Sequence, residues 1–113
     1  SSEHMKIDRA LSVMLKEKKL KKSDIIAKSG IENHYAYQIF SGVKIPSRDK
    51  VIMLCAAFAL SPEEAIRLMK ITGYAPLYGK CERDNAILFG LTKKLSLLEI
   101  NELLYELGCE LLI

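Results

Sequence analysis

The chain has few of the residues that catalytic and metal sites need. Its three cysteines, Cys55, Cys81 and Cys109, are far apart and form no Cys-x-x-Cys pair, so they predict neither a disulfide framework nor a zinc site. His34 is the only histidine after residue 5, which leaves none for a separate Ser-His-Asp or Cys-His arrangement. Glycine-rich phosphate loops are also absent. We therefore expect no enzyme, no metal and no cofactor, and a reduced, cytoplasmic protein.

Long apolar runs and low-complexity segments are missing too. The longest apolar run, residues 51–60, is far shorter than the ~20 residues of a membrane span. Half of the residues are hydrophobic, which argues against disorder, and no segment alternates as a strand does. Residues 1–5, Ser-Ser-Glu-His-Met, are typical of an expression scar. The rest is expected to be all-α and to make no membrane contact.

Charge is distributed unevenly along the chain. Residues 1–50 hold eleven Lys or Arg and six Asp or Glu, whereas residues 51–113 hold six and eight. A lysine-rich solvated surface would explain the basic half. A surface that faces phosphate would produce the same asymmetry.

Residues 20–47 carry the pattern of a helix-turn-helix. A short helix is predicted from Ser23 to Lys28, followed by a Ser-Gly-Ile turn and a second helix from about Asn33 to Ser41. Gly30 suits the left-handed backbone of a tight turn, and Gly42 is placed as a helix stop. In such a unit the second helix enters the major groove of DNA.

This stretch resembles the phage-repressor (Cro/C1, XRE) family of DNA-binding domains over roughly residues 7–69. The likeness rests on the end of helix 1 at Lys18-Lys19-Leu20, the apolar-x-x-x-Gly-apolar turn at residues 26–31, and Gly42 with Pro46-Ser47 after the second helix. The resemblance implies a five-helix domain that binds DNA as a twofold dimer.

Three features depart from the family pattern. Lys22 stands where the family usually has Gln, and the large and small partners Ile26 and Ala36 are exchanged, a swap that a packed core tolerates. The helix at residues 33–41 also contains no Lys or Arg. This last feature favours an alternative function, a protein-interaction module whose aromatic face is Tyr35, Tyr37 and Phe40.

The outward face of the second helix supplies the candidate DNA contacts. Amide side chains can bond the edge of adenine in pairs, and the candidate base contacts are Asn33, His34, Tyr37 and Gln38. The candidate phosphate contacts are Lys22, Ser41, Lys44 and Arg48. Backbone N–H groups at the start of the helix are expected to attract an anion as well. Arg48 has a competing structural role, because an Arg-Asp pair recurs at Arg83-Asp84.

A helical hairpin is repeated with a shift of 35 residues. The shift aligns Arg48-Asp49 with Arg83-Asp84 and Leu60-Ser61 with Leu95-Ser96, and both serines begin a Ser-x-x-Glu capping pattern. Duplication and convergence on a good hairpin both explain it. We expect a helix-turn-helix domain at residues 6–73 and a hairpin extension at residues 74–113, packed as one unit of about seven helices.

The last helix has more leucine than one buried stripe needs. Leu98 and the apolar end Leu111-Leu112-Ile113 lie outside that stripe, and exposed apolar patches often mark a partner. We therefore expect a homodimer through residues 82–113. The sequence as a whole predicts a DNA-binding transcriptional regulator, with double-stranded DNA as partner; in the alternative function the partner is an unidentified protein.

Overall fold

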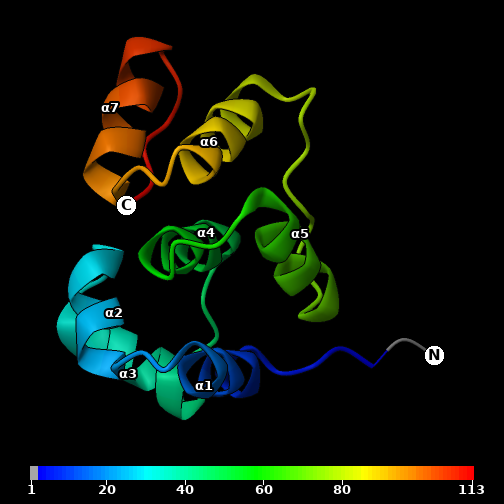
Figure 1. The fold of residues 1–113 in the computed structure, drawn as a ribbon, viewed down its shortest axis with the longest axis vertical. Coiled ribbons are helices and arrows are strands. Elements are labelled where there is room, and N and C mark those ends of the chain that lie inside the picture. Colours follow the sequence, from blue (N-terminus) through cyan, green and yellow to red (C-terminus); the bar gives the residue numbers. More distant parts are fainter. Residues whose placement is uncertain (1–2) are drawn as a thin grey trace.

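Seven helices and no strand make up residues 3–113, the part of the chain that the computed structural model describes (Figure 1). The helices are α1 (Ile7–Lys18), α2 (Lys22–Ser29), α3 (Asn33–Ser41), α4 (Arg48–Ala57), α5 (Pro62–Ile71), α6 (Glu82–Thr92) and α7 (Leu97–Glu106). The expected all-α architecture is confirmed. None of these helices is long and apolar enough to cross a bilayer.

The predicted expression scar lies only partly within the described residues, since residues 1–2 fall outside them. Within the remainder, the Met5 N–H donates to the Ile71 carbonyl at 2.8 Å. The segment before α1 therefore lies against the end of α5.

Helix α4 forms the centre of the molecule. In Figure 1 it lies between the layer of α1, α2 and α3 and the pair α6 and α7. Every residue from Val51 to Ala57 is buried, because helices pack on α4 from several sides. A helical segment that is apolar all round, as residues 51–57 are, fits only such a central position.

The α2–α3 pair has the bounds expected of the helix-turn-helix, give or take one residue. The buried Ser29 hydroxyl donates to the Ile26 carbonyl at 2.8 Å and accepts from the Ile31 N–H at 3.1 Å, which fixes the turn. Gly30 adopts the left-handed backbone that was predicted, with φ 71°. Both exchanged core partners, Ile26 and Ala36, are buried.

The two hairpins, α4–α5 and α6–α7, repeat each other in detail. Both predicted capping boxes are present, at Ser61 with Glu64 and at Ser96 with Glu99. Each first helix is followed by a left-handed residue at the equivalent place, Ala59 with φ 53° and Lys94 with φ 57°. The repetition in sequence is therefore a repetition in structure.

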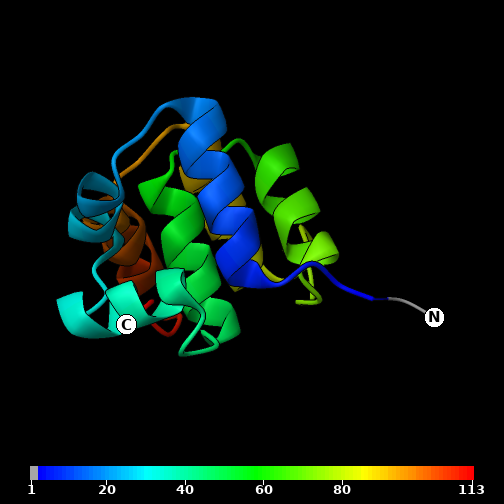
Figure 2. The same ribbon diagram turned by 90° about the horizontal axis from the view of Figure 1, so that it is seen from below.

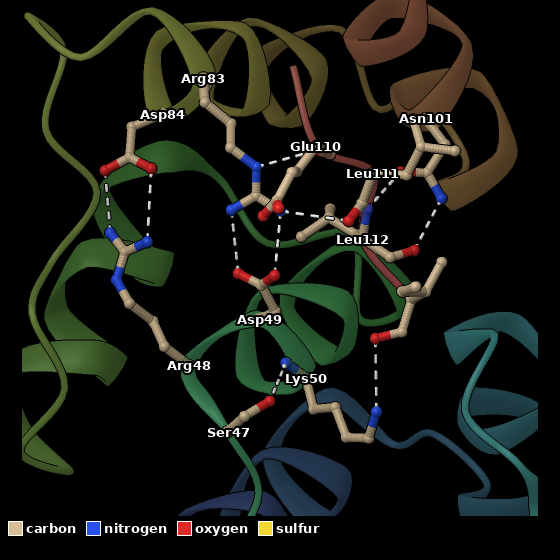
Figure 3. A network of polar contacts seen from close by, with 11 residues as sticks. Ser47, Arg48, Asp49, Lys50, Arg83, Asp84, Asn101, Glu110, Leu111 and Leu112 are labelled. Carbon is tan, nitrogen blue, oxygen red and sulfur yellow. Dashed lines mark hydrogen bonds and ion pairs between the residues drawn. The ribbon is translucent and has the colours of Figure 1, made fainter.

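The hairpins hold each other through reciprocal ion pairs (Figure 3). Arg48 of the first hairpin contacts Asp84 of the second at 2.8 Å, and Arg83 of the second contacts Asp49 of the first at 2.9 Å. Helix α4 also packs on α7 while α5 packs on α6. Each hairpin thus makes to the other the same contacts that it receives, as two objects related by a twofold axis do. The two hairpins are therefore related by an approximate internal twofold axis.

The same two arginines fasten the segment that follows each hairpin. The Nε of Arg48 donates to the Ala75 carbonyl and the Nε of Arg83 to the Glu110 carbonyl, both at 2.9 Å. Ala75 and Glu110 are themselves equivalent under the shift of the repeat. The recurring Arg-Asp pair thus has the structural role that its repetition suggested.

The C-terminal segment corrects part of the dimer expectation. Leu112 is 1% exposed, and its N–H and carbonyl both bond the side-chain amide of Asn101, at 2.7 and 2.8 Å. Leu112 was expected in a contact with a second chain, but it is buried in its own chain. Leu98, Leu111 and Ile113 remain exposed.

Candidate nucleic-acid interface

The start of α3 is capped by an acidic side chain. The Glu32 carboxylate accepts from the His34 N–H at 2.8 Å and from the Tyr35 N–H at 2.9 Å. These bonds from the backbone, first of all the one from His34, hold the pKa of Glu32 below its ordinary value. Two of the N–H groups that were expected to attract an anion are therefore occupied by a carboxylate of the chain itself.

The outward face of α3 is polar and accessible. Asn33, His34 and Tyr37 are exposed and Gln38 is half-buried, whereas the opposite face, Ala36 with Ile39 and Phe40, lies in the core. Figure 2 looks onto the layer that contains α3. All four candidate base contacts thus share one accessible surface.

Tyr35 lies at the margin of this surface and packs inward. Its ring is half-buried, and the Lys50 ammonium lies 5.7 Å from the ring centroid. Lys50 also donates to the Ile113 backbone oxygen at 3.4 Å. Tyr35 therefore packs against Lys50 at the edge of the α3 face.

Two lysines flank the α3 face. Lys22 begins α2 and lies 5.8 Å from the centroid of the Phe40 ring, which holds it beside α3. Lys44 is exposed in the loop after α3, where its N–H donates to the Gln38 carbonyl at 3.1 Å. The Ser41 hydroxyl is exposed and donates to the same carbonyl at 3.1 Å. Three of the four candidate phosphate contacts therefore lie at the edges of the α3 face.

Arg48, the fourth, is committed to partners within the chain. Its guanidinium donates four hydrogen bonds, two to Asp84 and one each to the carbonyls of Ala75 and Pro76. This use of its donors leaves little capacity for a phosphate.

Sequence reasoning missed two features of this surface. Val43 and Ile45, on either side of Lys44, are 67% and 81% exposed, although aliphatic residues usually pack. Their position in the loop between Gly42 and Pro46 could have indicated this exposure. The Glu32 cap was missed because Ser, Thr, Asp and Asn are the usual N-cap residues.

No cluster of three His, Cys, Asp or Glu in residues 3–113 could hold a metal ion. Comparisons of the chain with models of protein families, with curated proteins and with solved structures find no match. Any assignment of function therefore depends on the surface of α3 and its flanking lysines.

Proposed function

We propose that this protein is a sequence-specific DNA-binding transcriptional regulator that inserts α3 into the major groove. The observation that carries the proposal is the accessible polar face of α3 between Lys22 and Lys44. A helix that presents amide and phenol groups between two cations has donors and acceptors for base edges and charges for the backbone. The proposal includes a cytoplasmic location and no catalytic step.

Each side chain then has a distinct role. Asn33 and Gln38 hydrogen-bond base edges, with His34 and Tyr37 beside them, while Lys22, Ser41 and Lys44 hold phosphates. Arg48, the first residue of α4, joins this end of the helix to Ala75 and Asp84 and has no role in DNA binding in this proposal. Because α3 itself carries no cation, specificity depends on hydrogen bonds and affinity on the flanking lysines.

Substitution of Gln38 tests this assignment. Gln38→Ala should weaken binding to the preferred duplex, selected from a random pool, by roughly 1–3 kcal/mol and should relax the preference at one base pair. Asn85→Ala removes an exposed amide on α6 and is the matched control. Fluorescence anisotropy with selected and scrambled duplexes measures both effects. An equal loss on both duplexes would remove Gln38 as a base contact.

A protein-interaction module is the second candidate, and the Glu32 carboxylate at the start of α3 favours it. A fixed negative charge at this place repels phosphate, and the exposed Val43 and Ile45 give the neighbouring loop an apolar surface. The candidates differ in one property. A protein-interaction module binds no duplex in a salt-dependent way, and a DNA-binding regulator does.

A further inference from the structure

A groove with a volume of about 380 Å³ lies between α1 and α5. Helix α1 packs on α3, and α5 packs on α4 and α6, but α1 and α5 make little direct contact with each other. The volume of the groove is in the range of small-molecule sites in proteins. The space between the two helices is therefore large enough for a ligand.

Contacts between the two sides bridge this groove at both ends. At one end the Lys18 ammonium lies 2.9 Å from the Glu64 carboxylate, and at the other the Met5 N–H donates to the Ile71 carbonyl. Glu64 and Ile71 are seven residues apart on α5, so the groove is about 10 Å long. A helix of a partner protein could lie along the groove only if one of these bridges opened. The occupant that fits is therefore a small molecule.

The lining of the groove is mostly apolar. Ala10, Leu60 and Leu68 are buried and form its floor, whereas Val13 and Ile71 are exposed on its walls. Exposed aliphatic side chains beside a hollow are stabilised by contact with an apolar ligand. The groove therefore favours a molecule with a hydrocarbon group.

Four charged side chains also line the groove, and two of them lack an ionic partner. Lys18 and Glu64 pair with each other. Glu17 on α1 and Arg67 on α5 are exposed and form no ion pair within residues 3–113. Both lie within one turn of the Lys18–Glu64 bridge, on opposite walls. This end of the groove thus offers one unpaired anion and one unpaired cation.

We propose that this groove binds a free amino acid with an apolar side chain. The Arg67 guanidinium pairs with the α-carboxylate, whose two oxygens match its fork of donors. The Glu17 carboxylate accepts hydrogen bonds from the α-ammonium, and the apolar side chain lies between Val13 and Leu68. A fatty acid has no cation for Glu17, and an amine has no anion for Arg67. A zwitterion with a hydrocarbon group is therefore the ligand whose charges match those of the groove.

This site is separate from the α3 surface. It shares no residue with the candidate DNA contacts or with the ion pairs that join the two hairpins. Binding of an amino acid and binding of DNA are therefore tested apart, and the first test requires no DNA.

The methionine methyl groups allow binding at this site to be measured. Met5 and Met14 line the groove, whereas Met53 and Met69 are buried and do not line it. The intact protein, labelled with ¹³C in its methionine methyl groups, is titrated by NMR with leucine, methionine and phenylalanine, each up to about 10 mM. At least one of these amino acids should shift the Met5 and Met14 signals in a saturable way and leave those of Met53 and Met69 in place. The absence of a saturable shift with all three, or equal shifts of all four methionines, would overturn the proposal.

Analogues that lack one charge test the two polar contacts. For leucine these are isocaproate, which has no ammonium, and isoamylamine, which has no carboxylate. Each should bind about fivefold more weakly than the amino acid, because one contact with an exposed charged side chain is lost. Equal binding of the amino acid and both analogues would contradict the recognition of a zwitterion.

Variants assign each contact to its side chain. Arg67→Gln should weaken binding of the amino acid about fivefold without weakening binding of the amine, and Glu17→Gln should weaken it as much without weakening binding of the carboxylate. Lys70→Gln and Glu63→Gln remove exposed charges of α5 outside the groove and are the matched controls. Circular dichroism checks that each variant keeps its helices. Affinities in the Arg67 and Glu17 variants that equal those of the controls would overturn the proposal.

Discussion

Arg48 and Arg83 form the same contact in two different environments. Both pair with an aspartate of the opposite hairpin, but the Asp84 side chain is 8% exposed and that of Asp49 is 35% exposed. Asp84 also accepts from the Tyr78 N–H at 3.0 Å. The internal repeat therefore provides two Arg-Asp ion pairs that differ chiefly in the burial of the aspartate.

Removal of each aspartate charge should reveal this difference. Asp84→Asn keeps the shape but leaves Arg48 beside a neutral group at a buried site, so it should lower the free energy of unfolding by about 2 kcal/mol. Asp49→Asn, in the more exposed pair, should lower it by about 1 kcal/mol or less. Urea unfolding followed by circular dichroism measures both. Equal losses, or a larger loss in Asp49→Asn, would contradict this account of the pairs.

The sequence predicted individual side chains where local rules apply. Both Ser-x-x-Glu capping boxes could be predicted because each partner lies within one turn. The recurrence of Arg-Asp indicated a structural role for Arg48, but its partner lies 36 residues away in the other hairpin, and no local pattern reports such a distance. The Glu32 cap of α3 could not be predicted for another reason, since glutamate has a longer side chain than the usual N-cap residues.

At the scale of the elements, the turn between α2 and α3 is joined to the last helix. A Cβ at Gly30 would collide with the Leu97 side chain of α7. The extension is thus packed against the turn between α2 and α3, so a side chain at Gly30 would meet a residue far along the chain.

Two glycines with nearly the same φ angle allow the cost of the Leu97 contact to be measured apart from the cost of backbone strain. Gly30 has φ 71° and Gly108 has φ 72°, but a Cβ at Gly108 would meet no atom within 4 Å. Gly108→Ala should therefore cost only the strain of the left-handed backbone, about 1–2 kcal/mol. Gly30→Ala should cost about 0.5–1.5 kcal/mol more, because the half-buried Leu97 side chain must leave its preferred rotamer. Thermal and urea unfolding of both variants measure the difference, and equal costs would contradict the contact.

Element positions could be predicted more fully than element contacts. Gly30 and Gly42 marked the helix ends, so the observed bounds of α2 and α3 differ from the predicted ones by at most one residue at each end. Leu112 was misplaced because the apolar pattern of α7 ends before it. The Asn101 side chain hydrogen-bonds the backbone of Leu112, and the Leu112 side chain lies in the core. A hydrogen bond between residues eleven positions apart leaves no periodic pattern in the sequence.

At the scale of the whole molecule, the fold separates a basic part from a nearly neutral part. Residues 1–47, which contain α1, α2 and α3, hold nine Lys or Arg and five Asp or Glu, whereas residues 48–113, which contain the two hairpins, hold eight and nine. The all-α class and the seven helices could be predicted from periodicity and capping. The internal twofold axis could not, because a repeat in sequence does not specify how its two copies face each other.

Salt-dependent binding of duplex DNA tests the central claim most directly. The intact protein is titrated into a fluorescent random-sequence duplex at several salt concentrations, together with Lys22→Ala, Lys44→Ala and the control Lys80→Ala in the connection before α6. We predict that log K falls linearly with log salt, that each of the first two variants makes the slope shallower by about one, and that the control does not change it. Absence of salt-dependent binding, or slopes that are the same in all four proteins, would contradict the assignment of this surface to DNA.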